Sequence, residues 1–166
     1  MKPTEQTILY AEDTETDAYL FERALRRAGV AQRLQVVADG HAAIDYLSKA
    51  IESGEPSKRL PVLVLLDVKM PMVTGFDVLN WIRATPGLIS LVTLMFSSST
   101  HPADVQRAYA LGANGYLVKP CSIEETINIG KALKTLWLTD HHMPNRTSPA
   151  EHFHQHAQAF LCPLAV

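Results

Sequence analysis

The sequence predicts an α/β protein in which a parallel sheet is covered by helices on both faces. Short apolar runs alternate five times with longer segments of helical periodicity. One run, VLVLL at residues 62–66, is apolar at every position, which is typical of a strand buried on both faces of a parallel sheet. Because successive strand–helix pairs are joined by right-handed crossovers, this alternation indicates a doubly wound sheet.

Five strands are predicted, over residues 7–11, 34–38, 62–66, 91–96 and 115–118. Each is a short apolar run, and the third is bounded by Pro61 and Asp67. Residues 52–59 combine serine, glycine, proline and charged side chains, which predicts a loop before the third strand.

Five helices are predicted, over residues 17–28, 41–53, 75–84, 102–111 and 122–138. Gly29 ends the first helix, and the Pro86-Gly87 pair stops the third. Pro102 suits a first helical turn, where a missing N–H costs little. Ser122 and Glu125 have the spacing of a capping box at the start of the last helix.

Size and composition narrow the class of protein. The 166 residues suit one domain with an extension, and the net charge of −2 argues against a general nucleic-acid or anionic-membrane surface. No apolar run approaches the roughly 20 residues that span a bilayer, and the N-terminus lacks the features of a signal peptide. Cys121 and Cys162 form no CxxC motif, and we expect Cys121 to be a small buried side chain. We therefore expect a cytoplasmic, reduced protein.

Polar side chains follow four of the five strands. They are Glu12 and Asp13 after the first strand, Asp67 after the third, Ser97 after the fourth and Lys119 after the fifth. Parallel strands present their carboxyl ends at one edge of the sheet, so these groups are expected to converge there. Adjacent carboxylates repel unless a cation compensates, and oxygen ligands favour Mg²⁺. The set suits phosphoryl transfer onto Asp67, with the metal and the lysine neutralising charge.

Each of these residues has a plainer interpretation when it is taken alone. Asp13 and Thr14 could cap the first helix, and Thr100 the fourth. Ser97 lies in a serine-rich loop, and an isolated Lys119 would be a solvated surface charge. The coincidence of polar groups at the same end of four strands favours a functional site.

Four segments carry a resemblance to a known family. They are ILYAED at 8–13, VLLDVKMPMVTG at 64–75, LMFSSS at 94–99 and GANGYLVKP at 112–120. In this order they resemble the motifs of the receiver domain of two-component response regulators, over about residues 8–138. The resemblance implies a flavodoxin-like (βα)5 fold with strand order 2-1-3-4-5. It also divides the chain into a receiver domain at 1–138 and a C-terminal extension at 139–166.

The resemblance implies a role for each site residue. Asp67 is the phosphoacceptor, and Lys119 pairs with the phosphoryl group. Mg²⁺ is held by Glu12, Asp13, Asp67 and the backbone carbonyl of Lys69, directly or through water. Ser97 closes on the phosphoryl oxygen, and Tyr116 is the aromatic residue whose rotamer follows that movement. A cis bond between Lys119 and Pro120 is also expected.

Two features depart from the family pattern. Glu12 stands where Asp is commoner, and its longer side chain can still ligate. Lys69 lies two residues after Asp67. Its amine either acts at the site, by pairing with Glu12 or by repositioning the water that hydrolyses the acyl phosphate, or points to solvent.

Further segments of the sequence are similar to those of the small regulators paired with phytochrome-type histidine kinases. They include ADGHAAIDYL at 38–47 and TLWL at 135–138. This similarity implies a single-domain response regulator that accepts its phosphoryl group from a histidine kinase of the phytochrome type. It also implies a homodimer through the fourth helix, fifth strand and fifth helix. Such a protein is not an enzyme, although it assists its own phosphorylation and dephosphorylation.

Two other classes of protein remain possible from the sequence. An aspartyl-phosphate phosphatase on a similar sheet would usually need a second Asp two residues after the nucleophile, where this chain has Lys69. A phosphorylation-independent interaction scaffold would not need the complete set of site residues.

The segment from residue 139 to residue 166 contains five of the seven histidines, His141, His142, His152, His154 and His156. No cysteine or acidic group completes a convincing metal site with them, so we expect a polar extension. Its final residues, FLCPLAV, are apolar and could dock on the domain or on a second subunit. The extension is too short for a DNA-binding output domain, which favours signalling through protein contacts without direct binding to nucleic acid or membrane.

Overall fold

The computed structural model describes residues 6–52 and 60–138. Five parallel strands form one sheet in the order β2-β1-β3-β4-β5, which confirms the predicted fold class and strand order. The strands are β1 (Thr7–Ala11), β2 (Arg33–Val37), β3 (Leu63–Leu66), β4 (Thr93–Ser97) and β5 (Gly115–Val118). The helices are α1 (Glu15–Arg27), α2 (Gly40–Glu52), α4 (Gly75–Ala84), α5 (Pro102–Ala110) and α6 (Ile123–Leu133), which continues as the π-helical segment η2 (Lys134–Leu138).

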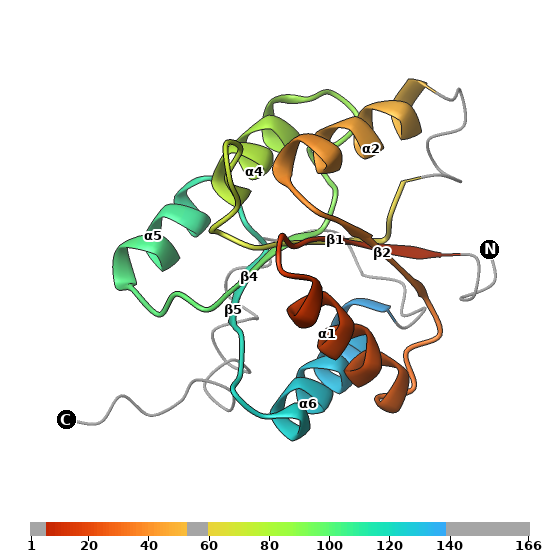
Figure 1. Ribbon diagram of the computed structural model, residues 1–166. Helices are drawn as coiled ribbons and strands as arrows, with labels where there is room; N and C mark the ends of the chain where they lie inside the picture. The colour runs from red at the N-terminus through yellow and green to blue at the C-terminus, as the bar shows by residue number, and fades with distance from the viewer. Residues whose placement is uncertain (1–5, 53–59, 139–166) are drawn as a thin grey trace.

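The helices cover the sheet on both faces, with α1 and α6 on one side and α2, α4 and α5 on the other (Figure 1). Strand β3 shows why its sequence is continuously apolar. Leu63 and Leu65 pack into the core beneath α1 and α6, whereas Val64 and Leu66 pack into the opposite core. All four residues of this strand are fully buried.

The core beneath α1 and α6 contains three contacting aromatic rings. The ring centroid of Tyr10 lies 5.1 Å from that of Phe21 and 5.8 Å from that of Phe96. Phe21 and Phe96 lie 4.9 Å apart, and all three side chains are buried. These tilted contacts join β1, α1 and β4 in one buried cluster near the carboxyl ends of the strands.

Several predictions of local structure need correction. The last helix was expected to be one continuous element over 122–138, but its final residues form η2. Only the Ser122 half of the expected capping box forms, with the side chain accepting from the Glu125 N–H. His101, not Thr100, caps α5: its imidazole Nδ1 accepts the Ala103 N–H at 3.2 Å. Cys121 is exposed rather than buried.

The cis bond expected between Lys119 and Pro120 is also wrong, since no residue in the described ranges has a cis peptide bond. The trans form is the lower-energy isomer even before proline. The predicted loop at 52–59 and the histidines beyond residue 138 lie outside the described residues, apart from Glu52 at the end of α2. Among the described residues, no helix combines the length and apolar character that crossing a bilayer requires.

Glycine is required where α4 begins, because this helix approaches β3 closely. A Cβ atom on Gly75 would lie 2.1 Å from the backbone oxygen of Asp67. Neighbouring Thr74 completes a capping box with Asp77, which fixes the start of the helix. The backbone of Asp67 is therefore packed against the first turn of α4.

We predict that Gly75→Ala lowers the free energy of unfolding by about 3 kcal/mol, the upper end of the usual range for overpacked sites. Urea denaturation measures this loss. Gly87→Ala is the control, because Gly87 has a φ of +89° with no atom within 4 Å of an added Cβ. The control should lose only the roughly 1 kcal/mol of a left-handed alanine. Equal losses for the two variants would contradict the steric argument.

Candidate functional site

Strand register brings the predicted site residues to one edge of the sheet. In the β1–β3 pair, Ala11 lies opposite Leu66, so Glu12 and Asp67 follow at the same level. The Asp67 N–H donates to the Ala11 carbonyl at 3.0 Å, and the Lys119 N–H donates to the Ser97 carbonyl at 2.8 Å. The backbone therefore delivers groups from four strands to a single site.

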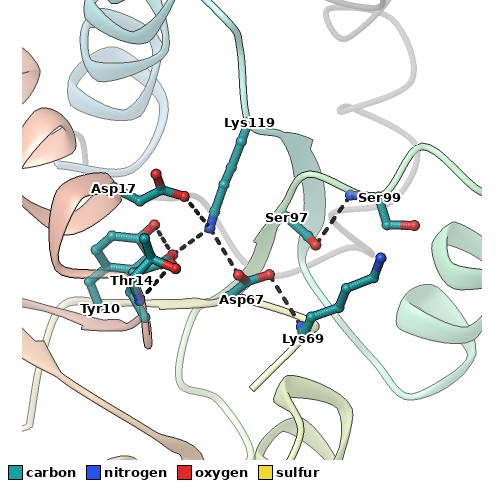
Figure 2. A network of polar contacts seen from close by, with 9 residues as sticks. Tyr10, Thr14, Asp17, Asp67, Lys69, Ser97, Ser99 and Lys119 are labelled. Carbon is teal, nitrogen blue, oxygen red and sulfur yellow. Dashed lines mark hydrogen bonds and ion pairs between the residues drawn. The ribbon is translucent and has the colours of Figure 1, made fainter. Parts of the chain in front are cut away.

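The amine of Lys119 is at the centre of the site, surrounded by three carboxylates (Figure 2). Its Nζ lies 2.5 Å from Glu12 Oε2, 2.9 Å from Asp67 Oδ2 and 3.1 Å from Asp17 Oδ2. Burial alone would lower the pKa of Lys119, but its hydrogen bonds to Glu12 and Asp67 outweigh this effect and raise the pKa above its ordinary value. The Lys119 amine therefore stays protonated and positively charged at neutral pH, and it does not act as an acid.

Glu12 is buried, with 2% of its surface exposed, and its carboxylate has three hydrogen-bond donors. Oε2 accepts from the Tyr10 hydroxyl at 2.5 Å and from Lys119, and Oε1 accepts the Thr14 N–H at 3.2 Å. Burial and then the bond to Glu12 raise the pKa of Tyr10 far above its ordinary range, so the hydroxyl remains a donor. These donors offset the desolvation of the buried Glu12 carboxylate.

The carboxylates of Glu12, Asp13 and Asp67 each offer an oxygen that lies within 4.8 Å of the others. Glu12 and Asp67 are buried, and Asp13 is exposed, so the group opens to solvent on the Asp13 side. Because the ligand set contains oxygen only, it fits a hard divalent cation such as Mg²⁺. The acidic cluster is thus typical of a divalent-cation site, while a contribution from the Lys69 carbonyl stays a prediction.

Lys69 contributes to the site through its backbone, since its N–H donates to Asp67 Oδ1 at 3.3 Å. Its side chain is exposed and extends away from Lys119 (Figure 2). The structure shows no ion pair between Lys69 and the buried Glu12. Of the two interpretations of this side chain, the one that points it to solvent agrees with the structure.

Ser97, the last residue of β4, and Tyr116 on β5 both contact the loop between β4 and α5. Ser97 is fully buried and its Oγ accepts the Ser99 N–H at 3.3 Å. The Tyr116 hydroxyl donates to the Ser99 carbonyl at 2.9 Å, and the Ser99 hydroxyl donates to Asp104 at 2.5 Å. Burial raises the pKa of Tyr116, so its hydroxyl remains a donor in this contact. Both predicted switch residues therefore contact one loop that leads from the site to α5.

Two residues of the site were not predicted from the sequence. Asp17 lies on the first turn of α1 and contacts Lys119 across 102 positions of sequence. The sequence showed only that Asp17 lies near the start of a predicted helix, where an acidic residue is favourable in any protein. Tyr10 resembles an ordinary core residue of a strand, and nothing in its neighbours indicates that its hydroxyl meets Glu12. Thr14 does occupy the N-cap of α1, although its side chain makes no capping hydrogen bond.

The sequence matches a family of signalling proteins. Residues 8–131 match the family described as the response regulator receiver domain. The probable methanogenesis regulatory protein FilR2 of Methanothrix harundinacea is 37% identical over 131 residues, which cover 79% of this chain and 83% of FilR2. The response regulator Rcp1 of Synechocystis is 30% identical over 133 residues, which cover 80% of this chain and 89% of Rcp1.

Solved structures agree with the sequence relatives. The phosphorylated cyanobacterial phytochrome response regulator RcpA superposes with a TM-score of 0.73 at 29% identity, over 85% of this chain and 99% of that one. The Mn²⁺-bound form of Rcp1 gives a TM-score of 0.70 at 26% identity, over 84% of this chain and 99% of that one. From its strand order, its acidic cluster and these relatives, the chain belongs to the response regulator receiver domain family, with the response regulator Rcp1 and the phytochrome response regulator RcpA among its relatives.

Proposed function

We propose that the protein is a single-domain response regulator that accepts a phosphoryl group on Asp67 from a histidine kinase. The observation that carries the proposal is the contact of 2.9 Å between Lys119 Nζ and Asp67 Oδ2, beside the oxygen cluster formed with Glu12 and Asp13. A nucleophile, a permanent cation and a cation-binding cluster thus share one partly open edge of the sheet.

In the proposed reaction an Asp67 carboxylate oxygen forms a bond to phosphorus as the phosphorus–nitrogen bond of a kinase phosphohistidine breaks. The electron pair of the broken bond stays with the histidine nitrogen. Bound Mg²⁺ would supply charge neutralisation for the transferring oxygens, held by Glu12, Asp13, Asp67 and the Lys69 carbonyl. Lys119 would pair with the phosphoryl group, and the chain would assist its own phosphorylation and dephosphorylation without being an enzyme for another substrate.

The output of the proposed switch runs through the β4–α5 loop. A phosphoryl group adds charge and acceptor oxygens at Asp67, and Ser97 lies at the end of the strand beside it. Movement of Ser97 would change the contacts of Ser99, and hence those of Tyr116. We infer that this biases the face formed by α5, β5 and α6, through which two copies would form a homodimer.

The phytochrome and bacteriophytochrome response regulators among the similar structures support a kinase of the phytochrome type. In this proposal residues 1–138 are the receiver domain and residues 139–166 a C-terminal extension. The proposed regulator acts in the cytoplasm through protein contacts. The interaction scaffold remains the rival, since it would keep this fold without using Asp67 as an acceptor.

We predict that Asp67→Asn abolishes phosphoryl incorporation from acetyl phosphate and Mg²⁺, because the variant lacks the nucleophilic carboxylate. Intact mass measurement gives the result directly. Asp45→Asn, at an exposed position of α2, is the matched control and should be labelled like the wild type. Chelation of Mg²⁺ should also abolish labelling. Unchanged labelling of Asp67→Asn would disprove the assignment and favour the scaffold.

We predict that Lys119→Met has a free energy of unfolding about 3 kcal/mol lower than that of the wild type, with both proteins measured in EDTA at neutral pH. The reason is that two buried carboxylates lose their cation. Urea titrations measure the loss. The pKa of Lys119 is raised in the folded state, so its stabilising charge is complete below about pH 10 and declines as the pH rises further. The gap between wild type and variant should therefore stay constant from pH 7 to 9 and narrow above pH 10.

The exposed lysine variant Lys49→Met serves as the control for this experiment and should show no such gap. Millimolar Mg²⁺ should stabilise Lys119→Met more than the wild type, since the metal replaces the missing cation. A gap that already narrows between pH 7 and 9 would contradict the raised pKa.

We predict that phosphorylation increases the dimer fraction and that Tyr109→Lys prevents this increase while Asp67 is still labelled. Tyr109 is 38% exposed on α5, so the substitution places a charge on the proposed interface. Light scattering during size-exclusion chromatography measures the molecular mass. Ile89→Lys, which replaces a 61% exposed residue in the segment between α4 and β4, outside the proposed interface elements, should dimerise normally. Dimerisation of both variants would place the interface elsewhere.

A further inference from the structure

Tyr10 brings a polar group into an otherwise apolar core. Its ring is fully buried and packs against Phe21 and Phe96. Its hydroxyl nevertheless belongs to the polar network of the site and lies 2.5 Å from Glu12 Oε2 (Figure 2). A hydroxyl donating to a carboxylate at this separation forms a short, charge-assisted hydrogen bond. Because the ring is held on its sides by two aromatic residues, the donor has a fixed position.

The acceptor sites of Glu12 are distributed unequally between its two oxygens. A carboxylate has about four lone-pair sites, two on each oxygen. Oε2 accepts from both Tyr10 and Lys119, so it is saturated. Oε1 accepts only the Thr14 N–H, at 3.2 Å, so it has one free site. Tyr10 and Lys119 together therefore occupy Oε2 and leave Oε1 as the oxygen with a free site for a cation shared with Asp13 and Asp67.

We propose that Tyr10 is a positioning residue for the divalent-cation site, holding Glu12 through Oε2 so that Oε1 faces the cation. This inference rests on the proposed function, because it assumes that Glu12, Asp13 and Asp67 bind Mg²⁺. Hydrogen bonds to ligand side chains orient them, and the loss of such a partner typically lowers metal affinity by 10–100-fold.

The Tyr10 hydroxyl also provides a donor to Glu12 that would stay in place if Lys119 moved. The amine contacts Glu12, Asp17 and Asp67 at once, and a phosphoryl group on Asp67 would compete for it. If Lys119 turned from Glu12 to the phosphoryl oxygens, Oε2 would lose one donor while buried. The Tyr10 hydroxyl would remain as a donor to that oxygen, so Lys119 could leave without exposing an unsatisfied buried charge.

The alternative is that Tyr10 only fills space in the aromatic cluster, and Tyr10→Phe separates the two roles. The substitution keeps the ring and removes only the hydroxyl. Calorimetric titration with MgCl₂ should give a dissociation constant about tenfold higher than that of the wild type. Tyr19→Phe, which removes a hydroxyl from a 63% exposed residue of α1, should bind Mg²⁺ like the wild type.

A double-mutant cycle with Glu12→Gln tests whether Tyr10 acts through Glu12. Tyr10→Phe should weaken Mg²⁺ binding in the wild-type background and change it by less than twofold when Gln occupies position 12. Proton NMR of the full chain supplies a readout that packing alone would not move. The buried Tyr10 hydroxyl proton should give a downfield resonance that disappears in Tyr10→Phe and shifts on addition of MgCl₂.

The outcomes distinguish this inference from the proposed function. If the wild type binds Mg²⁺ and Tyr10→Phe binds it equally well, the positioning role is overturned and the metal site stands. The positioning role is likewise overturned if the effect of Tyr10→Phe persists in full with Gln at position 12. If the wild type binds no Mg²⁺, both the proposed metal site and the role of Tyr10 are overturned.

Discussion

The single ammonium group of Lys119 is the interaction on which the site depends. Three carboxylates contact it, and two of them, Glu12 and Asp67, are buried. Without a cation the buried pair would repel and would lose solvation that nothing replaces. The raised pKa of Lys119 follows from the same contacts and keeps the cation present at physiological pH. The ion pairs of Lys119 therefore join the ends of β1, β3 and β5.

The strand register makes these ion pairs possible. Ala11 and Leu66 lie side by side, so the next residues of β1 and β3 present their carboxylates together. Lys119 donates its N–H to Ser97, which ties the cation to the end of β4. Gly75 also packs closely against the backbone of Asp67, which fixes the end of β3 against α4. A shift of one residue in any of these pairings would turn the polar groups away from one another.

The site is also connected to the core beneath it. Tyr10 contacts Glu12 through its hydroxyl and Phe96 through its ring, and Phe96 immediately precedes Ser97. The acidic cluster and the β4–α5 loop are thus joined by buried side chains as well as by the sheet. The proposed metal site and the proposed switch therefore rest on the same buried aromatic cluster.

The sequence by itself determined the fold class, the three elements at residues 7–11, 75–84 and 115–118, and the strand ends that supply Glu12, Asp67, Ser97 and Lys119. These features follow from local periodicity and from the rule that parallel strands end at one edge. Only the tertiary structure decided that Asp17 and the Tyr10 hydroxyl join the site, that the Lys69 side chain points away and that His101 caps α5. Such contacts depend on distances between side chains from different elements, and those distances are set by packing and not by the spacing of residues along the chain.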